Sequence, residues 1–270
     1  MGKLYVVGTP IGNLEDITLR GLRILREVSL IAAEDTRRAR ILTKHYEIDT
    51  PVTSYFEGNK LTKLDTILDT LDAANVALIS EAGMPGLSDP GYELIQTAIQ
   101  RGYEVVPVPG PTAPVTALVI SGLPTDAFLF LGYLPRRESR RRRLLNRVAR
   151  EEVTIILFET PHRLLDSLAD IEAVLGDRPL ALCREMTKVH EEIWRGTVSE
   201  ARSAFAERGP RGEFTLVIAG VVEEQQRWEE EEVRAALEDL LAKGVRRPDA
   251  ARRVADLSGW ERGVVYKLGL

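Results

Sequence analysis

The stretch Leu4-Tyr5-Val6-Val7-Gly8-Thr9-Pro10-Ile11-Gly12-Asn13-Leu14 lies at the start of the chain and indicates its fold. Its apolar half predicts a strand, which must end soon because Pro10 has no N–H to continue a ladder. Gly8 and Gly12 let a ligand approach the backbone. Open α/β sheets bind ligands at the carboxyl ends of their strands, so we expect one wall of a binding cleft here. An ordinary β-turn explains the stretch equally well when it is taken alone.

Apolar runs alternate with amphipathic segments along the chain, which predicts strands joined by helical crossovers. Strands are expected at residues 3–7, 30–33, 51–55, 76–80, 104–108, 128–135, 153–158, 180–183 and 214–222. Helices are expected at residues 17–27, 37–45, 60–73, 92–101, 112–121, 136–150, 164–175 and 198–207. From residue 227 onward the pattern is helical, with breaks at Gly244 and Gly259.

This order predicts an α/β protein of two domains with a small helical extension. The first domain, residues 1–120, should hold a mostly parallel sheet, and the second, residues 125–222, a mixed sheet. The extension covers residues 227–270. The turn Gly122-Leu123-Pro124-Thr125-Asp126 is the expected boundary between the two sheets.

The amino-acid composition limits the classes of protein to which this chain can belong. The 270 residues are 44% hydrophobic and 29% charged, as in soluble globular proteins. The single cysteine excludes an internal disulfide and a cysteine-based metal cluster, and three widely spaced histidines predict no metal site. No apolar run approaches the ~20 residues that span a bilayer, and no signal-peptide pattern is present, so we expect a cytoplasmic protein.

Charge is segregated along the chain. The net charge of −5 argues against a general nucleic-acid binder, but residues 136–150 hold eight arginines and one acid. Residues 223–232 hold six glutamates and one arginine. A local basic patch can bind phosphates on an acidic protein, although a solvated helix face remains the alternative.

Two more predicted strands end in turns rich in glycine and proline. Residues 81–91 follow one of them, and Pro109-Gly110-Pro111-Thr112-Ala113 follows another. With residues 8–14, three such exits should share one sheet edge and form a ligand cleft. Neither GxGxxG nor GxxxxGK[ST] occurs, which disfavours a dinucleotide site and a P-loop. The expected ligand is held by backbone and apolar contacts.

Charged clusters follow three further predicted strands. They are Glu34-Asp35-Thr36-Arg37-Arg38, Glu159-Thr160-Pro161-His162-Arg163 and Arg184-Glu185-Met186-Thr187-Lys188. Carboxylates beside guanidiniums can orient a hydroxyl, accept its proton or clamp a phosphate. Acids at a helix N-terminus explain the first cluster without any catalytic role. A nucleophile elbow is not expected, because GxSxG is absent.

Taken in order, these segments resemble the tetrapyrrole-methylase superfamily, the class III methyltransferases that use S-adenosylmethionine. The resemblance covers roughly residues 3–222. It rests on residues 7–18, 32–37, 88–92, 110–113, 121–125, 161–163 and 184–188. The signatures GTPIGNLEDIT and AAEDTR are typical of the branch that methylates ribosomal RNA, whereas corrin and precorrin methylases lack them.

Two segments depart from this branch. Its histidine-rich SYHEHN segment reads Ser54-Tyr55-Phe56-Glu57-Gly58-Asn59 here, so a catalytic histidine in that loop is not expected. Its SDAGTP segment reads Ser80-Glu81-Ala82-Gly83-Met84-Pro85, in which Met84 replaces a threonine.

The resemblance implies methyl transfer from S-adenosylmethionine to the ribose 2′-hydroxyl of a cytidine in the decoding centre of 16S rRNA. The expected cofactor contacts are Thr9, Pro10, Gly83, Met84, Leu87, Thr112, Ala113 and Phe158. The acids expected to orient the hydroxyl or take its proton, without a ranking, are Glu34, Asp35, Glu159 and Glu185. The expected RNA contacts are Arg37, Arg136, Arg137, Arg140, Arg141, Arg163, Arg184 and Lys188. The expected partners are 16S rRNA, within the 30S subunit, and a second copy of the chain, because the superfamily is typically dimeric.

Two other functions stay open. A tetrapyrrole methyltransferase would not need the arginine-rich helix, and a non-enzymatic ribosome-binding protein would not bind S-adenosylmethionine. The C-terminal helices, which include Arg246, Arg247, Arg252 and Arg253, are predicted either to dock on RNA or to serve as a packing or dimer element.

Overall fold

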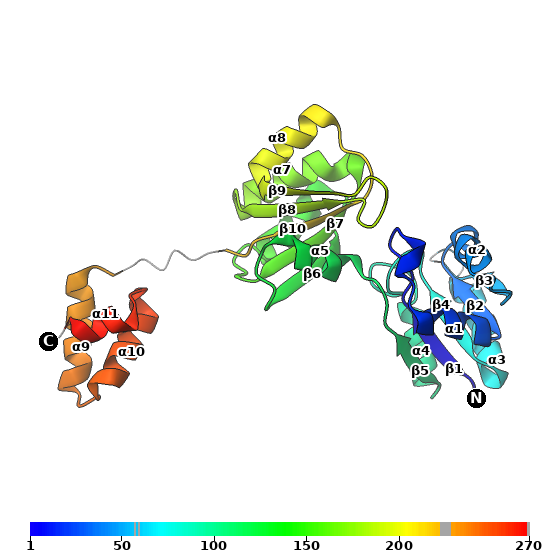
Figure 1. Cartoon of the computed structure of the whole chain (residues 1–270), viewed down its shortest axis with the longest axis horizontal. Coiled ribbons are helices and arrows are strands. Elements are labelled where there is room, and N and C mark those ends of the chain that lie inside the picture. The colour runs from blue at the N-terminus through cyan, green and yellow to red at the C-terminus, as the bar shows by residue number, and fades with distance from the viewer. Residues whose placement is uncertain (57, 59, 222–227, 269–270) are drawn as a thin grey trace. The chain divides into compact units, whose positions relative to one another are not determined.

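The computed structural model describes residues 1–56, 58, 60–221 and 228–268. The chain divides into two compact units, Met1–Val221 and Val222–Leu270. The first unit contains β1 (Lys3–Val7), η1 (Leu14–Asp16), α1 (Leu19–Glu27), β2 (Leu30–Ala33), α2 (Thr36–His45), β3 (Val52–Ser54), α3 (Lys60–Ala73), β4 (Val76–Ile79), α4 (Tyr92–Gln100), β5 (Glu104–Val108), α5 (Ala113–Ser121), β6 (Phe128–Tyr133), α6 (Glu138–Arg147), β7 (Thr154–Glu159), η2 (Pro161–Arg163), α7 (Leu164–Leu175), β8 (Pro179–Arg184), β9 (Glu192–Thr197), α8 (Val198–Arg208) and β10 (Phe214–Ile218) (Figure 1).

The first sheet is parallel throughout, with the strand order β3-β2-β4-β1-β5. Leu4 and Leu78 pack with residues of α3 and α4, whereas Val7 and Ile79 pack with residues of α1 and α2. Helices therefore cover both faces, which explains why these strands are continuous apolar runs. Because β1 lies between β4 and β5, the three exits rich in glycine and proline leave from neighbouring strands, as predicted.

The second sheet is mixed, as predicted, with the order β6-β7-β10-β8-β9. The β6–β7 pair is parallel and the other pairs are antiparallel. Residues of α6, α7 and α8 pack on one face of this sheet, and α5 packs on the other through Ala117 and Leu118. The boundary predicted at residues 122–126 therefore follows a helix that packs on the second sheet. The division into residues 1–120 and 125–222 stays a prediction, and residue 222 lies outside the described residues.

Most predicted elements are present, with ends shifted by local chemistry. Helix α1 begins at Leu19 rather than at residue 17, because the Thr18 hydroxyl accepts a hydrogen bond from the Gly21 N–H (3.0 Å) and caps the helix. The arginine-rich helix is shorter than predicted, and β10 ends at Ile218. Strand β9 was not predicted. It is a half-buried edge strand whose charged residues and Gly196 leave no apolar alternation.

The second unit has a core of its own. It contains α9 (Glu230–Ala242), α10 (Arg247–Ser258) and α11 (Arg262–Lys267), which pack around Val233, Leu237 and Val254. Both predicted breaks are confirmed, since Gly244 follows α9 and Gly259 (φ +69°) ends α10 in the left-handed conformation. In the part of the chain that the structure describes, no helix is long and apolar enough to cross a membrane.

An ion pair in the interior joins α6 to α7. The Arg141 guanidinium donates through Nε to Asp170 Oδ2 (2.5 Å), and both side chains are at most 7% exposed. Asp170 also accepts from Arg142 Nε (2.6 Å). Arg141 was predicted to contact RNA, but its guanidinium is buried and pairs with Asp170 instead.

We predict that Asp170→Ala lowers the free energy of unfolding of the first unit by about 3–5 kcal/mol, because it leaves the Arg141 charge buried without a partner. Arg143→Ala on the exposed side of the same helix is the control and should cost no more than about 0.5 kcal/mol. Urea denaturation measures both values. Equal costs for the two variants would contradict a structural role for the pair.

Candidate active site

The three strand exits of the first sheet meet through their backbones. Thr9 and Gly83 form an isolated antiparallel bridge with two backbone hydrogen bonds, whose nitrogen-to-oxygen distances are 2.9 and 3.0 Å. A Cβ atom on Gly8 would lie 2.8 Å from the Cα atom of Gly110, closer than real Cβ atoms come. Only glycine permits this approach. The exits of β1, β4 and β5 are therefore packed against one another as one surface.

A cavity of about 150 Å³ opens beside these exits. Six of the residues predicted to contact a cofactor line it: Gly83, Met84, Leu87, Thr112, Ala113 and Phe158. We name it the first cavity. The Met84 sulfur lies against Gly8, since a Cβ there would meet it at 2.7 Å. Met84, which replaces a threonine of the branch that methylates ribosomal RNA, therefore helps to pack the three strand exits together.

A second cavity, of about 360 Å³, adjoins the first. The other two predicted cofactor residues, Thr9 and Pro10, line it. The two cavities share the lining residues Ile11, Glu81, Ala82 and Glu213. All eight residues predicted to contact a cofactor thus lie on two neighbouring cavities, and their role in binding stays a prediction.

The first cavity is acidic. Glu81, Asp89 and Glu213 line it, and none of its described lining residues is Lys or Arg. Burial raises the pKa of Asp89 to about 7, and the charge of Glu34 contributes to this rise, against the opposing effect of the Ser80 hydroxyl. A cavity that gathers acids in this way favours a ligand with positive charge.

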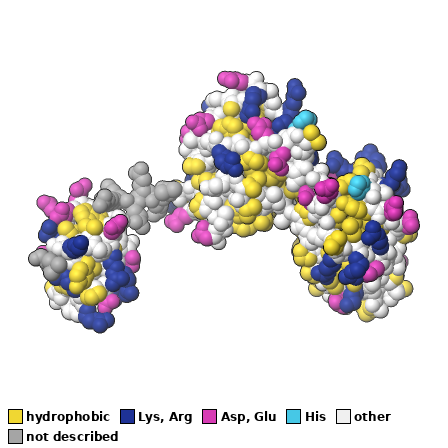
Figure 2. Space-filling model, in the orientation of Figure 1, with side chains coloured by type: hydrophobic (Ala, Val, Ile, Leu, Met, Phe, Trp, Pro, Cys, Tyr) yellow, Lys and Arg dark blue, Asp and Glu magenta, His cyan; other side chains and the backbone are white. Residues whose placement is uncertain are grey.

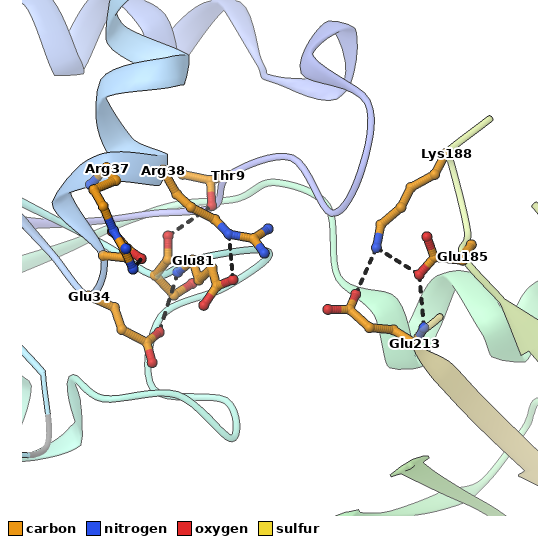
Figure 3. Close-up of polar contacts among 10 residues, drawn as sticks. Thr9, Glu34, Arg37, Arg38, Glu81, Glu185, Lys188 and Glu213 are labelled. Atoms are coloured by element: carbon orange, nitrogen blue, oxygen red, sulfur yellow. Dashed lines mark hydrogen bonds and ion pairs between the residues drawn. The ribbon is translucent and has the colours of Figure 1, made fainter. Parts of the chain in front are cut away.

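The second cavity contains both signs of charge (Figure 3). Arg38 Nε lies 2.6 Å from Glu81 Oε1. On the other side, Lys188 Nζ donates to Glu213 Oε2 and to Glu185 Oε1, each at 2.9 Å. Two cations thus line this cavity, each paired with an acid that is itself at a cavity wall.

Glu34 lies next to these cavities. Its Oε2 atom accepts a long hydrogen bond from the backbone N–H of Glu81 (3.4 Å) (Figure 3). Burial raises the pKa of the Glu34 carboxyl, and the charges of Glu81 and Asp35 act in the same direction. A carboxylate of raised pKa is a better proton acceptor than an ordinary one.

Asp35 and Glu185 are held by strong partners. Asp35 caps α2 by accepting from the Arg37 N–H (2.7 Å), and hydrogen bonds from the Arg37 side chain and backbone lower its pKa to about 2. Burial acts to raise the pKa of Glu185, but the Glu213 N–H (2.8 Å) and Lys188 outweigh it, so that the pKa is lowered. Both carboxylates are therefore stabilised in their charged form and are weak bases.

Glu159 lies inside the protein. It is 1% exposed and accepts hydrogen bonds from Ser167 Oγ (2.5 Å) and the Thr160 N–H (2.8 Å). Arg163 Nη2 lies 3.4 Å from its Oε2 atom. Its neighbour Phe158 lines the first cavity, and successive strand residues point to opposite faces, so Glu159 faces α7 instead.

The predicted RNA contacts fall into different environments. Arg136, Arg137 and Arg140 are exposed at the start of α6. Arg37 is exposed and pairs with Asp35, whereas Arg163 donates to the Leu134 carbonyl oxygen (2.5 Å) and is half-buried. Arg184 pairs with Glu192, and Lys188 lines the second cavity. Arg141 is the one residue of the set that is buried.

Four arginines of the C-terminal unit lie in α10 or directly before it. In Figure 2 dark blue side chains gather over α10, where Arg246, Arg252 and Arg253 are exposed. Arg247 is half-buried and donates to the Tyr266 carbonyl oxygen (3.3 Å). Three of these four arginines therefore reach the surface.

Several cavity residues were not predicted. They are Ile11, Glu81, Ala82, Asp89, Pro114, Tyr133, Glu213, Phe214 and Thr215. Asp89 lies in residues 88–92, one of the segments that resemble the methylase superfamily, and this resemblance was the signal in the sequence that pointed to it. Tyr133 ends β6 of the second sheet and Glu213 directly precedes β10. Neither belongs to a motif, and only the folded chain brings them to the cavity.

The comparisons with known proteins agree with this fold. The family model described as Tetrapyrrole (Corrin/Porphyrin) Methylases matches residues 3–202. A Synechocystis protein named ribosomal RNA small subunit methyltransferase I is 47% identical over 273 residues, which cover 100% of this chain and 98% of that protein. A Thermotoga maritima protein of the same name is 50% identical and covers 82% of this chain and 99% of its own length.

Two solved structures show the same fold. The cobalt precorrin-4 methyltransferase CbiF superposes with a TM-score of 0.62 at 20% identity, covering 80% of this chain and 94% of its own. A diphthine synthase gives a TM-score of 0.62 at 13% identity, with coverages of 81% and 90%. The chain belongs to the tetrapyrrole methylase family, within the group of relatives named ribosomal RNA small subunit methyltransferase I. The predicted fold is thereby confirmed.

Asp89 gives a prediction for stability against pH. The folded protein holds the Asp89 proton more tightly than the unfolded chain, which loses it near pH 4. The free energy of unfolding of the wild type, relative to Asp89→Asn, should therefore fall as the pH rises from about 4 to about 7 and then level off. Urea denaturation between pH 4 and pH 8 measures this difference. A difference that stays constant with pH would contradict the raised pKa.

Proposed function

We propose that the chain is an S-adenosylmethionine-dependent methyltransferase that modifies the ribose 2′-hydroxyl of a cytidine in the decoding centre of 16S rRNA. The relatives that cover the whole chain carry the name of a ribosomal RNA small subunit methyltransferase. The observation that carries the proposal is the pair of adjoining cavities, one acidic and partly apolar, the other lined by Arg38 and Lys188. They suit a cationic cofactor and an anionic polymer respectively.

The lining of the first cavity fits this cofactor. S-adenosylmethionine supplies a methyl group on a positively charged sulfonium. Glu81, Asp89 and Glu213 provide negative charge to match it, and Met84 and Phe158 provide apolar surface. Gly83, which has no side chain, lines the same cavity with main chain. These residues would hold the cofactor by charge, backbone polarity and apolar contact.

The second cavity is where we expect the RNA to enter. Lys188 and Arg38 lie at its wall and can each contact a phosphate while paired with an acid. The exposed residues Arg136, Arg137 and Arg140 would contact the RNA backbone farther away. Arg37, Arg163 and Arg184 remain proposed contacts, with part of their donor capacity already used. Arg141 is not among the proposed RNA contacts, because it is buried.

Glu34 is the acid that we favour for orienting the 2′-hydroxyl and accepting its proton. Its pKa is raised and it contacts the Glu81 backbone at the cavity wall, whereas Asp35, Glu159 and Glu185 are each held by strong hydrogen bonds. Correct orientation of two reactants can supply on the order of 7–11 kcal/mol. A general base adds on the order of 10²–10⁴-fold.

We further propose that the substrate is 16S rRNA within the 30S subunit and that the enzyme works in the cytoplasm as a homodimer. Exposed apolar side chains on α5, Val115 and Val119, support self-association. Light scattering of the purified chain separates a dimer from a monomer.

Methyl transfer tests the proposed function. The chain is incubated with 30S subunits that lack the modification and with methyl-labelled S-adenosylmethionine, and the labelled nucleotide is mapped. Label on a cytidine ribose in 16S rRNA is expected. Label on a base would contradict the 2′-O assignment. In a parallel reaction with a porphyrinoid in place of the 30S subunits, label on the porphyrinoid, with none on RNA, would favour a tetrapyrrole methyltransferase. Failure to bind the cofactor in calorimetry would favour a non-enzymatic ribosome-binding protein.

Glu34→Gln should lower kcat by about 10²-fold or more, because the amide cannot accept the proton. Cofactor affinity, measured by calorimetry, should change far less than kcat. Glu27→Gln, at an exposed acid that pairs with Arg23, is the control and should behave like the wild type. A Glu34→Gln enzyme with wild-type kcat would exclude Glu34 as the base.

A further inference from the structure

A third cavity, of about 300 Å³, lies at the end of α8 (yellow in Figure 1) and of the second sheet. Its lining residues are Arg184, Glu192, Phe205, Arg208, Gly209 and Arg211. None of these lines the first or the second cavity. Of the six, only Arg184 was singled out in the sequence.

The charge of this cavity is positive. Three guanidiniums face one carboxylate among its described lining residues. Glu192 accepts from both Arg184 Nη1 (3.2 Å) and Arg208 Nη1 (2.7 Å). Each guanidinium has five N–H donors, so one carboxylate leaves most of them unused. An anion with several acceptor oxygens would satisfy the remaining donors.

The arginines are held in place before any ligand arrives. The Arg208 guanidinium carbon lies 4.5 Å from the centre of the Phe205 ring, and Phe205 itself is 3% exposed. Arg184 Nε donates to the Arg211 carbonyl oxygen (3.0 Å). A guanidinium that is stacked or hydrogen-bonded loses less freedom on binding an anion, and its planar fork matches phosphate.

The turn that carries Arg211 is attached to the candidate active site. A Cβ atom on Gly212 would lie 2.5 Å from Glu185 Cγ, and Glu185 accepts from the Glu213 N–H (2.8 Å). Glu213, two residues after Arg211, lines both the first and the second cavity. Arg184 directly precedes Glu185 in the chain, and consecutive Cα atoms lie 3.8 Å apart. A polymer at the second cavity can therefore reach the third.

We propose that Arg184, Arg208 and Arg211 bind a backbone phosphate of the RNA strand at a nucleotide next to the one that is methylated. This inference rests on the proposed function and adds a binding site to it. The site contacts phosphate and not a base edge, so it sets the position of the strand without reading its sequence.

Substitution of Arg211 can distinguish phosphate binding from a structural role of these arginines. Arg184 and Arg208 share Glu192 and help to join β8, β9 and α8. The Arg211 side chain is exposed and makes no hydrogen bond or ion pair with the part of the chain that the structure describes. Arg211→Gln therefore removes one cation from the cavity and leaves the ion pairs of the fold intact.

The test measures binding of a fluorescent single-stranded RNA, with the decoding-centre sequence, to the full chain at several salt concentrations. Each lost phosphate contact should lower the slope of log K against log salt by about 0.7. Because the three arginines share one phosphate, we expect nearly this full change for the Arg208→Gln/Arg211→Gln double variant and a smaller change, still above that of Arg202→Gln, for Arg211→Gln. The KM for 30S subunits should rise by about tenfold, with cofactor affinity unchanged. Arg202→Gln, on α8 and paired with Glu172, is the control.

A slope for Arg211→Gln equal to that of Arg202→Gln would overturn the proposal. If the wild type still methylates 16S rRNA in that case, the proposed function stands without this site. Absence of methylation by the wild type would instead contradict the proposed function, and the salt slopes still decide on phosphate binding. Inorganic phosphate that stabilises the wild type but not Arg211→Gln, with equal RNA slopes, would assign the cavity to a free anion and overturn the RNA assignment.

Discussion

The backbone contact between Gly8 and Gly110 is the constraint on which the candidate site depends. A side chain at either position would separate the exits of β1 and β5, since a Cβ would lie under 3 Å from the opposite backbone. The Thr9–Gly83 bridge adds the exit of β4 to the same surface. The first cavity opens beside these packed exits, and its lining residues come from them and from the second sheet. Such a fixed wall suits a small ligand whose polar groups need fixed partners.

Electrostatics divides the site in two. In the first cavity burial and neighbouring acids raise the pKa of Asp89, because a charged carboxylate is costly there, and a cationic ligand would lower that cost. Across the shared wall, Lys188 and Arg38 compensate Glu213 and Glu81. Glu34 has no such cation among its described contacts, and burial raises its pKa. This contrast separates Glu34 from Asp35 and Glu185, although all three follow strands.

The arginines illustrate why density in a sequence does not define a binding surface. Arg140 and Arg141 are adjacent, yet one is exposed and the other lies 2.5 Å from Asp170 in the interior. The helical period turns consecutive residues by about 100°, so a run of four arginines cannot face one side. Conversely, Arg208 and Arg211 lie outside any basic run and still share a cavity with Arg184.

Three properties could be read from the sequence alone: the order of strands and helices, the positions where three strands end, and the family. These properties depend on local periodicity, on glycine and proline, and on motifs that lie within a few residues. Strand β9 was not predicted, because an edge strand need not show alternating apolar and polar residues. Which charged groups are free to bind a ligand depends instead on contacts made in the folded protein. Asp170 lies 29 residues from Arg141, and Glu213 lies 25 residues from Lys188. Pairing and burial, which set charge and pKa, arise between residues that the chain brings together only when it folds.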